Sequence, residues 1–207
     1  MIRIENTEVT GLNAAIRGMR NPMNSWDKSD SSATGCDDED YLLGYNDHEL
    51  AMCLVNGGPV HAKFRRMIIV TFDITAPLYW WKEFDTYKVG TVRNSCSTMH
   101  KIHSRPIIAD DFSCEHLTYT SREALYDLVR LINEYREDFV KDNLKEDWWQ
   151  IIQLLPSSYN QRSTVQVNYE VLAGMYKYRK DHKLDEWREF CKWIETLPYA
   201  ELITGEK

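Results

Sequence analysis

MIIVTFDI, residues 67–74, decides the fold predicted for this chain. Its apolar side chains recur at every second position, namely Ile68, Val70, Phe72 and Ile74. A period of two is typical of a strand that buries one face. Thr75-Ala76-Pro77 follows and predicts the end of the strand, because proline suits the first turn of a helix. We therefore expect a helix over LYWWKEFDTYK, residues 78–88.

Polar side chains crowd the segment after this helix. Residues 90–100, GTVRNSCSTMH, combine hydroxyls, an amide, a thiol and cations. We expect a turn-rich loop whose hydroxyls and backbone amides can hold a phosphate. The alternative is a loop in which the same hydroxyls cap neighbouring backbone groups.

The bulk composition indicates one folded domain without a membrane span. The chain has 207 residues, of which 43% are hydrophobic and 12% aromatic, so it can bury a real core. A net charge of −7 and a pI of about 5.4 argue against a surface that coats nucleic acid. No apolar run is long enough to cross a bilayer, and residues 1–10 lack the apolar centre of a signal peptide. Five cysteines at irregular spacing are typical of reduced thiols, so we expect a cytoplasmic protein.

The remaining segments place the chain in the α+β class. In the first half we expect a strand over 1–10, a helix over 11–19, a surface loop over 24–40 with the acidic run 37–40, and a helix over 47–55. In the second half we expect helices over 120–140, 148–155, 165–179 and 184–194, with a polar loop over 157–164. Thr120 and Glu123 have the spacing of a capping box at the start of the first of these helices. The acidic run lacks the alternating ligands of a calcium loop.

Two separated blocks resemble, in order, the flavin-dependent thymidylate synthases (the ThyX family). The first block is GPVHAKF, residues 58–64, followed by the strand, Ala76-Pro77, the helix and the polar segment. The second is Leu155-Pro156, followed by Asn168 and Arg179 at nearly the family's spacing. The resemblance is strongest over residues 47–195. It implies a single, helix-rich α+β domain over 1–207 with a small, mainly antiparallel sheet.

The resemblance also implies an activity. The family converts dUMP to dTMP by reductive methylation with FAD, NADPH and methylenetetrahydrofolate, and it builds homo-oligomers, commonly tetramers. Several family positions differ here: its Arg-His-Arg element falls on Thr86-Tyr87-Lys88, and an arginine before the Leu-Pro pair falls on Ile152. The alternative is therefore a nucleotide- or flavin-binding regulator or sensor with the same fold and impaired catalysis. A purely structural or interaction protein is a third alternative. No nucleic-acid or membrane partner is expected.

Matching this chain to the family assigns candidate site residues. Those expected at the nucleotide are Glu83, Asn94, Ser95, Cys96, Ser97, Thr98, Arg162 and Arg179. Those expected at the flavin are His61, Lys63, Tyr87, Lys88, Thr91 and Asn168. Arg179 would bind phosphate through its guanidinium, whereas the alternative is a cation that stabilises a helix C-terminus.

Cys96 is the one candidate catalytic residue. It falls where the family has a serine near the reacting pyrimidine, and a thiolate is a better nucleophile than a hydroxyl. The alternative is a buried, unreactive thiol. A zinc site is a further alternative, with Cys96, His100, His103, Cys114 and His116 as ligands. These residues lack paired C-x2-C spacing, so we predict no metal. The aromatic residues expected only to pack are Trp80, Trp81, Phe84, Trp148 and Trp149.

Overall fold

The computed structural model describes residues 1–33 and 41–206, so the acidic run 37–40 lies outside the described residues. Mixed helices and a small antiparallel sheet confirm the predicted α+β class. Within the described ranges, no helix combines the length and the apolar character that a bilayer crossing requires.

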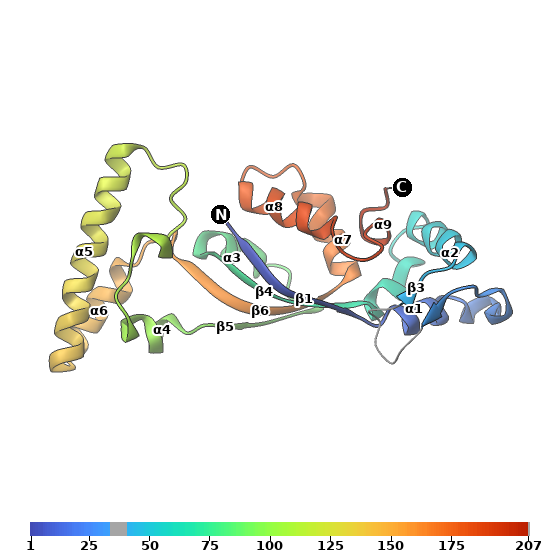
Figure 1. Ribbon diagram of the computed structural model, residues 1–207, viewed down its shortest axis with the longest axis horizontal. Helices are drawn as coiled ribbons and strands as arrows, with labels where there is room; N and C mark the ends of the chain where they lie inside the picture. The colour runs from blue at the N-terminus through green and yellow to red at the C-terminus, as the bar shows by residue number, and fades with distance from the viewer. Residues whose placement is uncertain (34–40, 207) are drawn as a thin grey trace. The chain divides into compact units, whose positions relative to one another are not determined.

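The main sheet has four strands, shown in Figure 1. Their order across the sheet is β1 (Arg3–Thr10), β4 (Ile69–Pro77), β6 (Asn160–Asn168) and β5 (Thr91–Ser95). The four alternating residues expected to face the core, Ile68, Val70, Phe72 and Ile74, are each 0% exposed. A second sheet pairs β2 (Ser32–Ala33) with β3 (Tyr41–Leu42) in antiparallel register.

Three boundaries predicted around these strands are wrong. Thr75-Ala76-Pro77 does not end β4, because the strand runs through Pro77. The expected loop over 90–100 contains β5, then the short helix α4 (Thr98–Lys101). The expected loop over 157–164 contains the start of β6, which also takes the first residues of the helix predicted over 165–179. Both segments are polar, and pairing between β5 and β6 overrides their loop-like composition.

All seven predicted helices are present, with shifted ends. The longer ones are α1 (Leu12–Met19), α2 (Tyr45–Asn56), α3 (Leu78–Phe84), α5 (Tyr119–Asp142), α6 (Lys145–Leu154), α7 (Tyr169–Arg179) and α8 (Asp185–Ile194), and α9 (Glu201–Thr204) is short. The short 3-10 helices are η1 (Asn21–Met23), η2 (Trp26–Lys28), η4 (Ala62–Met67), η5 (Ile102–Ser104) and η6 (Ala109–Asp111). The capping box predicted at Thr120 is wrong, because Thr118 caps α5 by accepting a hydrogen bond from the Ser121 amide.

Contacts divide the chain into two compact units. Unit 1 comprises residues 1–3, 74–86 and 94–163; unit 2 comprises 4–73, 87–93 and 164–207, of which residues 34–40 and 207 are not described. Each strand of the main sheet contributes residues to both units. The single domain expected over the whole chain remains a prediction, and the two units are described separately.

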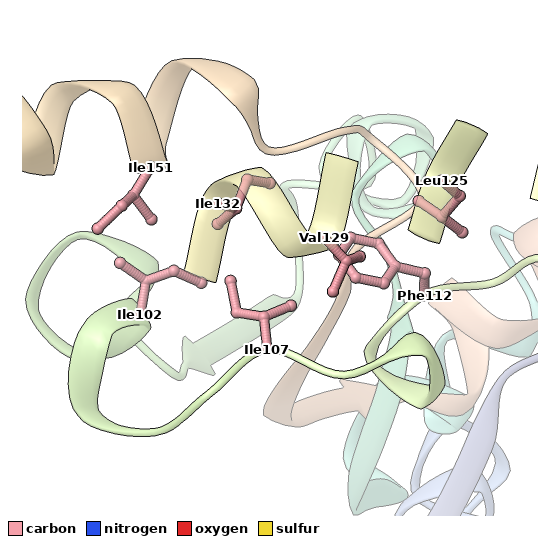
Figure 2. Close-up of a cluster of buried hydrophobic side chains, with 7 residues drawn as sticks. All are labelled: Ile102, Ile107, Phe112, Leu125, Val129, Ile132 and Ile151. Atoms are coloured by element: carbon pink, nitrogen blue, oxygen red, sulfur yellow. The ribbon is translucent and has the colours of Figure 1, made fainter. Parts of the chain in front are cut away.

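The core of unit 1 lies where α5 packs against α6. Figure 2 shows its buried members, namely Ile102, Ile107, Phe112, Leu125, Val129, Ile132 and Ile151. Ile152, where the family resemblance expects an arginine, packs against this cluster. Trp80, Trp81 and Phe84 are buried as predicted. Trp149 is 41% exposed, and its ring centroid lies 4.8 Å from that of Trp148, so these two rings pack against each other at the surface.

Unit 2 contains a buried ion pair. Arg20, after α1, donates from Nε to Asp47 of α2 at 2.5 Å, and both side chains are buried. The other Asp47 oxygen accepts hydrogen bonds from the hydroxyls of Ser29 and Ser31. Burial would raise the pKa of Asp47, but these hydrogen bonds outweigh burial and lower the pKa. The pair therefore fixes the segment after η2 against α2.

Candidate functional site

A cavity of about 580 Å³ in unit 1 gathers four of the predicted nucleotide-binding residues. They are Cys96, Ser97, Thr98 and Arg162. The first three follow one another where β5 ends and α4 begins, and Arg162 lies near the start of β6. Because β5 and β6 are neighbours in the sheet, residues 66 positions apart are brought to one wall of the cavity.

Two hydrogen bonds, one from its backbone amide and one to its backbone carbonyl, hold Cys96 in place. Its amide donates to the Arg162 carbonyl at 2.9 Å, and its carbonyl accepts from Nε2 of Gln161 at 2.7 Å. Gln161 is held in turn, because its carbonyl accepts from the indole of the buried Trp81 at 3.0 Å. Cys96 is exposed, so the expectation that this residue is buried is wrong.

The lining of this cavity is cationic, although the whole chain is acidic. Its basic side chains are Arg3, Lys101, Arg105 and Arg162, against the two acids Asp110 and Asp111. Arg105 is neutralised by a bidentate ion pair with Asp111, in which its Nη1 donates to Oδ2 at 2.8 Å. The positive charge that remains suits an anion such as a phosphate.

Three ionisable groups in the cavity have shifted pKa values. The hydrogen bond to Asp111 raises the pKa of the Arg105 guanidinium. Burial would raise the pKa of Asp111, but hydrogen bonds from Arg105 and from the Ile108 amide outweigh burial and lower it. Burial raises the pKa of the Tyr159 hydroxyl, and the Asp111 carboxylate raises it further. Asp111 is therefore a carboxylate and Tyr159 a neutral hydrogen-bonding group at neutral pH.

Some predicted nucleotide-binding residues of unit 1 do not line the cavity, and some residues that line it were not predicted. Glu83, Asn94 and Ser95 belong to unit 1 but are not among the lining residues. The sequence reasoning missed Lys101, Arg105, Tyr159 and Gln161, which line the cavity. The density of basic residues over 100–105 could have indicated Lys101 and Arg105. Tyr159 and Gln161 were not considered because a polar loop was predicted over 157–164.

Arg179 lies in unit 2, where it meets the predicted flavin residue Tyr87. Its Nε donates to the Tyr87 hydroxyl at 3.0 Å. The guanidinium carbon lies 4.8 Å from the ring centroid of the buried Trp187 and 5.7 Å from that of Tyr87. These are cation–π contacts, which hold the guanidinium plane at the end of α7.

Asn168, Gly90 and Thr91 form a second group in unit 2. The Asn168 side chain caps α7 by accepting from the Val171 amide at 3.0 Å. Gly90 has a φ of +78°, and a Cβ added there would lie 3.0 Å from Nδ2 of Asn168. Beside it, Oγ1 of Thr91 is buried and has no hydrogen-bond partner among the described residues. A buried hydroxyl of this kind can form a hydrogen bond with a bound ligand.

His61 and Lys63 line a separate cavity of about 730 Å³ in unit 2. Most of its lining is apolar and comes from α1, α2 and η4, including Met19, Leu50 and Phe64. Lys88 is exposed on the same unit. An apolar cavity with a few polar groups at its rim is typical of a site for a flat ring system.

The zinc alternative finds no geometric support. Across residues 1–33 and 41–206, no group of three or more His, Cys, Asp or Glu side chains is arranged to hold a metal ion.

Comparison with known proteins identifies the fold. No protein-family model matches the chain. No curated protein matches it in sequence. Two solved structures of the flavin-dependent thymidylate synthase ThyX from Helicobacter pylori, both with FAD and dUMP, superpose with TM-scores of 0.71 and 0.70. They are 17% and 18% identical to this chain, and each match covers 98% or more of both chains.

A third solved structure is the UMP/dUMP methylase PolB from Streptomyces cacaoi with 5-Br dUMP. Its TM-score is 0.66 at 12% identity, over 99% of this chain and 95% of that one. These likenesses show that the chain has the ThyX fold.

Proposed function

We propose that this protein binds a pyrimidine nucleotide and a flavin, and that it methylates dUMP to dTMP with FAD, NADPH and methylenetetrahydrofolate. The observation that carries the proposal is the cationic cavity that joins Cys96, Ser97 and Thr98 to Arg162. Three solved structures with the same fold contain dUMP or its 5-bromo derivative. A volume of about 580 Å³ is sufficient for a mononucleotide.

The residues of unit 2 fit a flavin at two points. The cavity beside His61 offers an apolar wall for a ring and Lys63 as a cation at its rim. The unpaired Oγ1 of Thr91 offers a hydrogen bond. When bound, a flavin would supply the electrons and carry the one-carbon unit, which are steps no side chain can perform.

The protein's own part in this reaction is binding and activation of the pyrimidine. Arg162 and Lys101 would hold the phosphate, and the Thr98 hydroxyl would face the base. The Ser97 hydroxyl accepts a hydrogen bond from the His100 amide at 3.1 Å and so caps α4, as the capping alternative expects.

Cys96 would then add as a thiolate to C6 of the uracil, after losing its proton to solvent. The S–C6 bond forms while the C5=C6 electrons shift toward the C4 carbonyl, so C5 becomes nucleophilic. After C5 has bonded to the one-carbon unit, loss of the C5 proton would release the carrier and leave an exocyclic methylene on C5. A hydride taken from the reduced flavin would turn this methylene into the methyl group while the C5=C6 bond re-forms and the thiolate leaves.

Two observations favour a second function, nucleotide binding without turnover. Ile152 packs in the apolar cluster of unit 1, where the family resemblance expects a phosphate-binding arginine. Tyr87 is bonded to Arg179 rather than presented alone for stacking. A protein that kept the cavity, but lacked the phosphate-binding arginine and a tyrosine ring available for stacking, would serve as a nucleotide sensor.

Two measurements separate these functions. If the protein is the enzyme, it should be yellow, with flavin absorbance at about 450 nm. It should also release tritium from [5-³H]dUMP when all cosubstrates are present. A protein that binds dUMP but neither takes up FAD nor releases tritium would be the sensor. A protein that binds neither dUMP nor FAD would contradict both proposed functions.

The homo-oligomer belongs to this proposal as well, since the resemblance implies sites built between subunits. We propose a tetramer. Sedimentation velocity at micromolar concentration would give a single species near four times the 24.4 kDa chain mass, and a monomer would contradict the proposal.

A further inference from the structure

We infer that a second cavity of unit 1, the α4–α6 cavity, binds a flat aromatic ring that carries an anionic group. Its walls come from residues 99–103, from the end of α5 and from the first turn of α6. It has a volume of about 420 Å³ and shares no lining residue with the nucleotide cavity. The inference does not depend on the proposed methylation of dUMP.

The segment formed by α4 and η5 presents one face to each cavity. Thr98, Lys101 and Arg105 line the nucleotide cavity, whereas His100 and His103 line the α4–α6 cavity. Residues three or four positions apart lie on the same face of a helix, so each set belongs to one face. The two histidines are therefore basic side chains that the proposed nucleotide site does not use.

The charge of the α4–α6 cavity favours an anion. Lys145 and the two histidines line it, and none of the described residues in its lining is acidic. Lys145 forms no ion pair among the described residues, and its Nζ lies 5.9 Å from the ring centroid of Trp149. An ammonium group and imidazole N–H groups are hydrogen-bond donors that suit the oxygens of a carboxylate or a phosphate.

His103 supplies a donor in a fixed orientation. Its Nδ1 is buried and has no hydrogen-bond partner among the described residues. A proton on Nδ1 would be a buried N–H without an acceptor, which costs free energy, so in the neutral ring the proton lies on Nε2. The ring packs edge-on against Phe139, with the centroids 4.9 Å apart and an interplanar angle of 75°. The Nε2–H group is therefore the one that can donate to a ligand.

Two aromatic side chains give the α4–α6 cavity flat walls. Phe139 of α5 and Trp148 of α6 line it, and both are half-buried. The Trp148 indole donates to the Met99 carbonyl at 3.1 Å, which ties α6 to α4 and orients the indole ring. A ligand would meet a ring already in place, so less conformational entropy is lost on binding. A volume of about 420 Å³ is sufficient for a molecule of two fused rings.

The test is equilibrium dialysis of the full chain with 2-naphthoate, a flat two-ring carboxylate. We expect saturable binding that weakens with salt, and weaker binding of the neutral amide 2-naphthamide. A parallel titration with 2-naphthyl phosphate shows whether the site prefers a phosphate or a carboxylate. Lys145→Glu should bind 2-naphthoate roughly tenfold more weakly, because an exposed attraction becomes a repulsion of similar size. Lys141→Glu makes the same change of charge at an exposed position outside the cavity and should bind as wild type does.

Nuclear magnetic resonance of the protein with ¹⁵N-labelled tryptophan locates the bound probe. The indole signal of Trp148, assigned with the Trp148→Phe variant, should shift when 2-naphthoate binds.

Three results would overturn the inference. One is no saturable binding of 2-naphthoate or 2-naphthyl phosphate below about 1 mM. Another is equal affinity of wild type and Lys145→Glu, provided that circular dichroism shows both folded. The third is binding that Lys63→Gln or Arg162→Gln weakens while Lys145→Glu does not, which would place the probe beside His61 or in the nucleotide cavity.

Discussion

The amide of Cys96 donates a hydrogen bond to the carbonyl of Arg162 at 2.9 Å. This single bond joins the two segments that the sequence analysis assigned separately to one nucleotide. It continues the pairing of β5 with β6 by one residue beyond β5, and it leaves both side chains at the cavity. A backbone bond between neighbouring strands is rigid, so the main chains at Cys96 and Arg162 keep a fixed separation.

The exposed Cys96 thiol should be protected from alkylation by dUMP. With N-ethylmaleimide and peptide mass spectrometry, Cys96 should react in the free protein and slow by about tenfold at ten times the dissociation constant of dUMP. Cys53 is exposed in unit 2 and serves as an internal control that dUMP should not protect. Burial and the Glu195 carboxylate raise the pKa of Cys191 to about 12, so this buried thiol should stay unlabelled. Equal protection of Cys53 and Cys96 would indicate a global effect instead of a bound nucleotide.

Gly90→Ala should destabilise the protein through both backbone strain and a clash. The φ of +78° disfavours alanine, and its Cβ would press on Nδ2 of Asn168, which caps α7. Gly58→Ala is the matched control, since Gly58 has a φ of +93° but no atom within 4 Å of the added Cβ. In urea unfolding, Gly90→Ala should cost about 1 kcal/mol more than Gly58→Ala, the usual worth of a helix cap. Equal costs would mean that the Asn168 cap does not depend on Gly90.

The buried pair of Arg20 and Asp47 should make stability fall in acid. The folded pKa of Asp47 is lowered below its unfolded value of about 3.9. Its contribution is therefore present above about pH 5 and is lost as the pH falls through the folded pKa. Asp47→Asn should cost about 3–5 kcal/mol at pH 7, because it leaves Arg20 buried without its counter-charge.

The control for this effect is Asp27→Asn, which removes an exposed carboxylate. Urea titrations from pH 7 to pH 3 should show wild type and Asp27→Asn losing stability in parallel. The gap between wild type and Asp47→Asn should narrow over the same range. A constant gap would show that the carboxylate of Asp47 does not titrate with folding.

The sequence predicted those elements whose apolar residues are periodic. β4 alternates between buried and partly exposed residues, and the stripe of Leu125, Val129 and Ile132 correctly predicted α5. β5 was missed because TVRNS buries no side chain, so it carries no apolar period. β6 offered a signal in Val165 and Val167, both buried, but its polar start was taken for a loop.

The candidate site was predictable in its parts but not in its assembly. Cys96, Ser97 and Thr98 were found as a run of reactive and polar residues, and Arg162 as a loop cation that could replace the missing phosphate arginine of the family. Their meeting depends on the neighbouring positions of β5 and β6, which local sequence does not encode. Lys101 and Arg105 were missed because they reach the cavity only through the turn formed by α4 and η5, which local sequence does not encode either.

Calorimetric titration of dUMP tests the central claim most directly, using wild type, Arg162→Gln and the control Arg130→Gln. Arg130 is exposed on α5 and pairs with Asp127, and it does not line the cavity. We predict saturable binding by wild type and Arg130→Gln. Arg162→Gln should bind about 10- to 150-fold more weakly, since a hydrogen bond to a charged group contributes about 1.5–3 kcal/mol. The same dissociation constant for all three proteins, or no binding by wild type, would contradict a nucleotide site at Cys96 and Arg162.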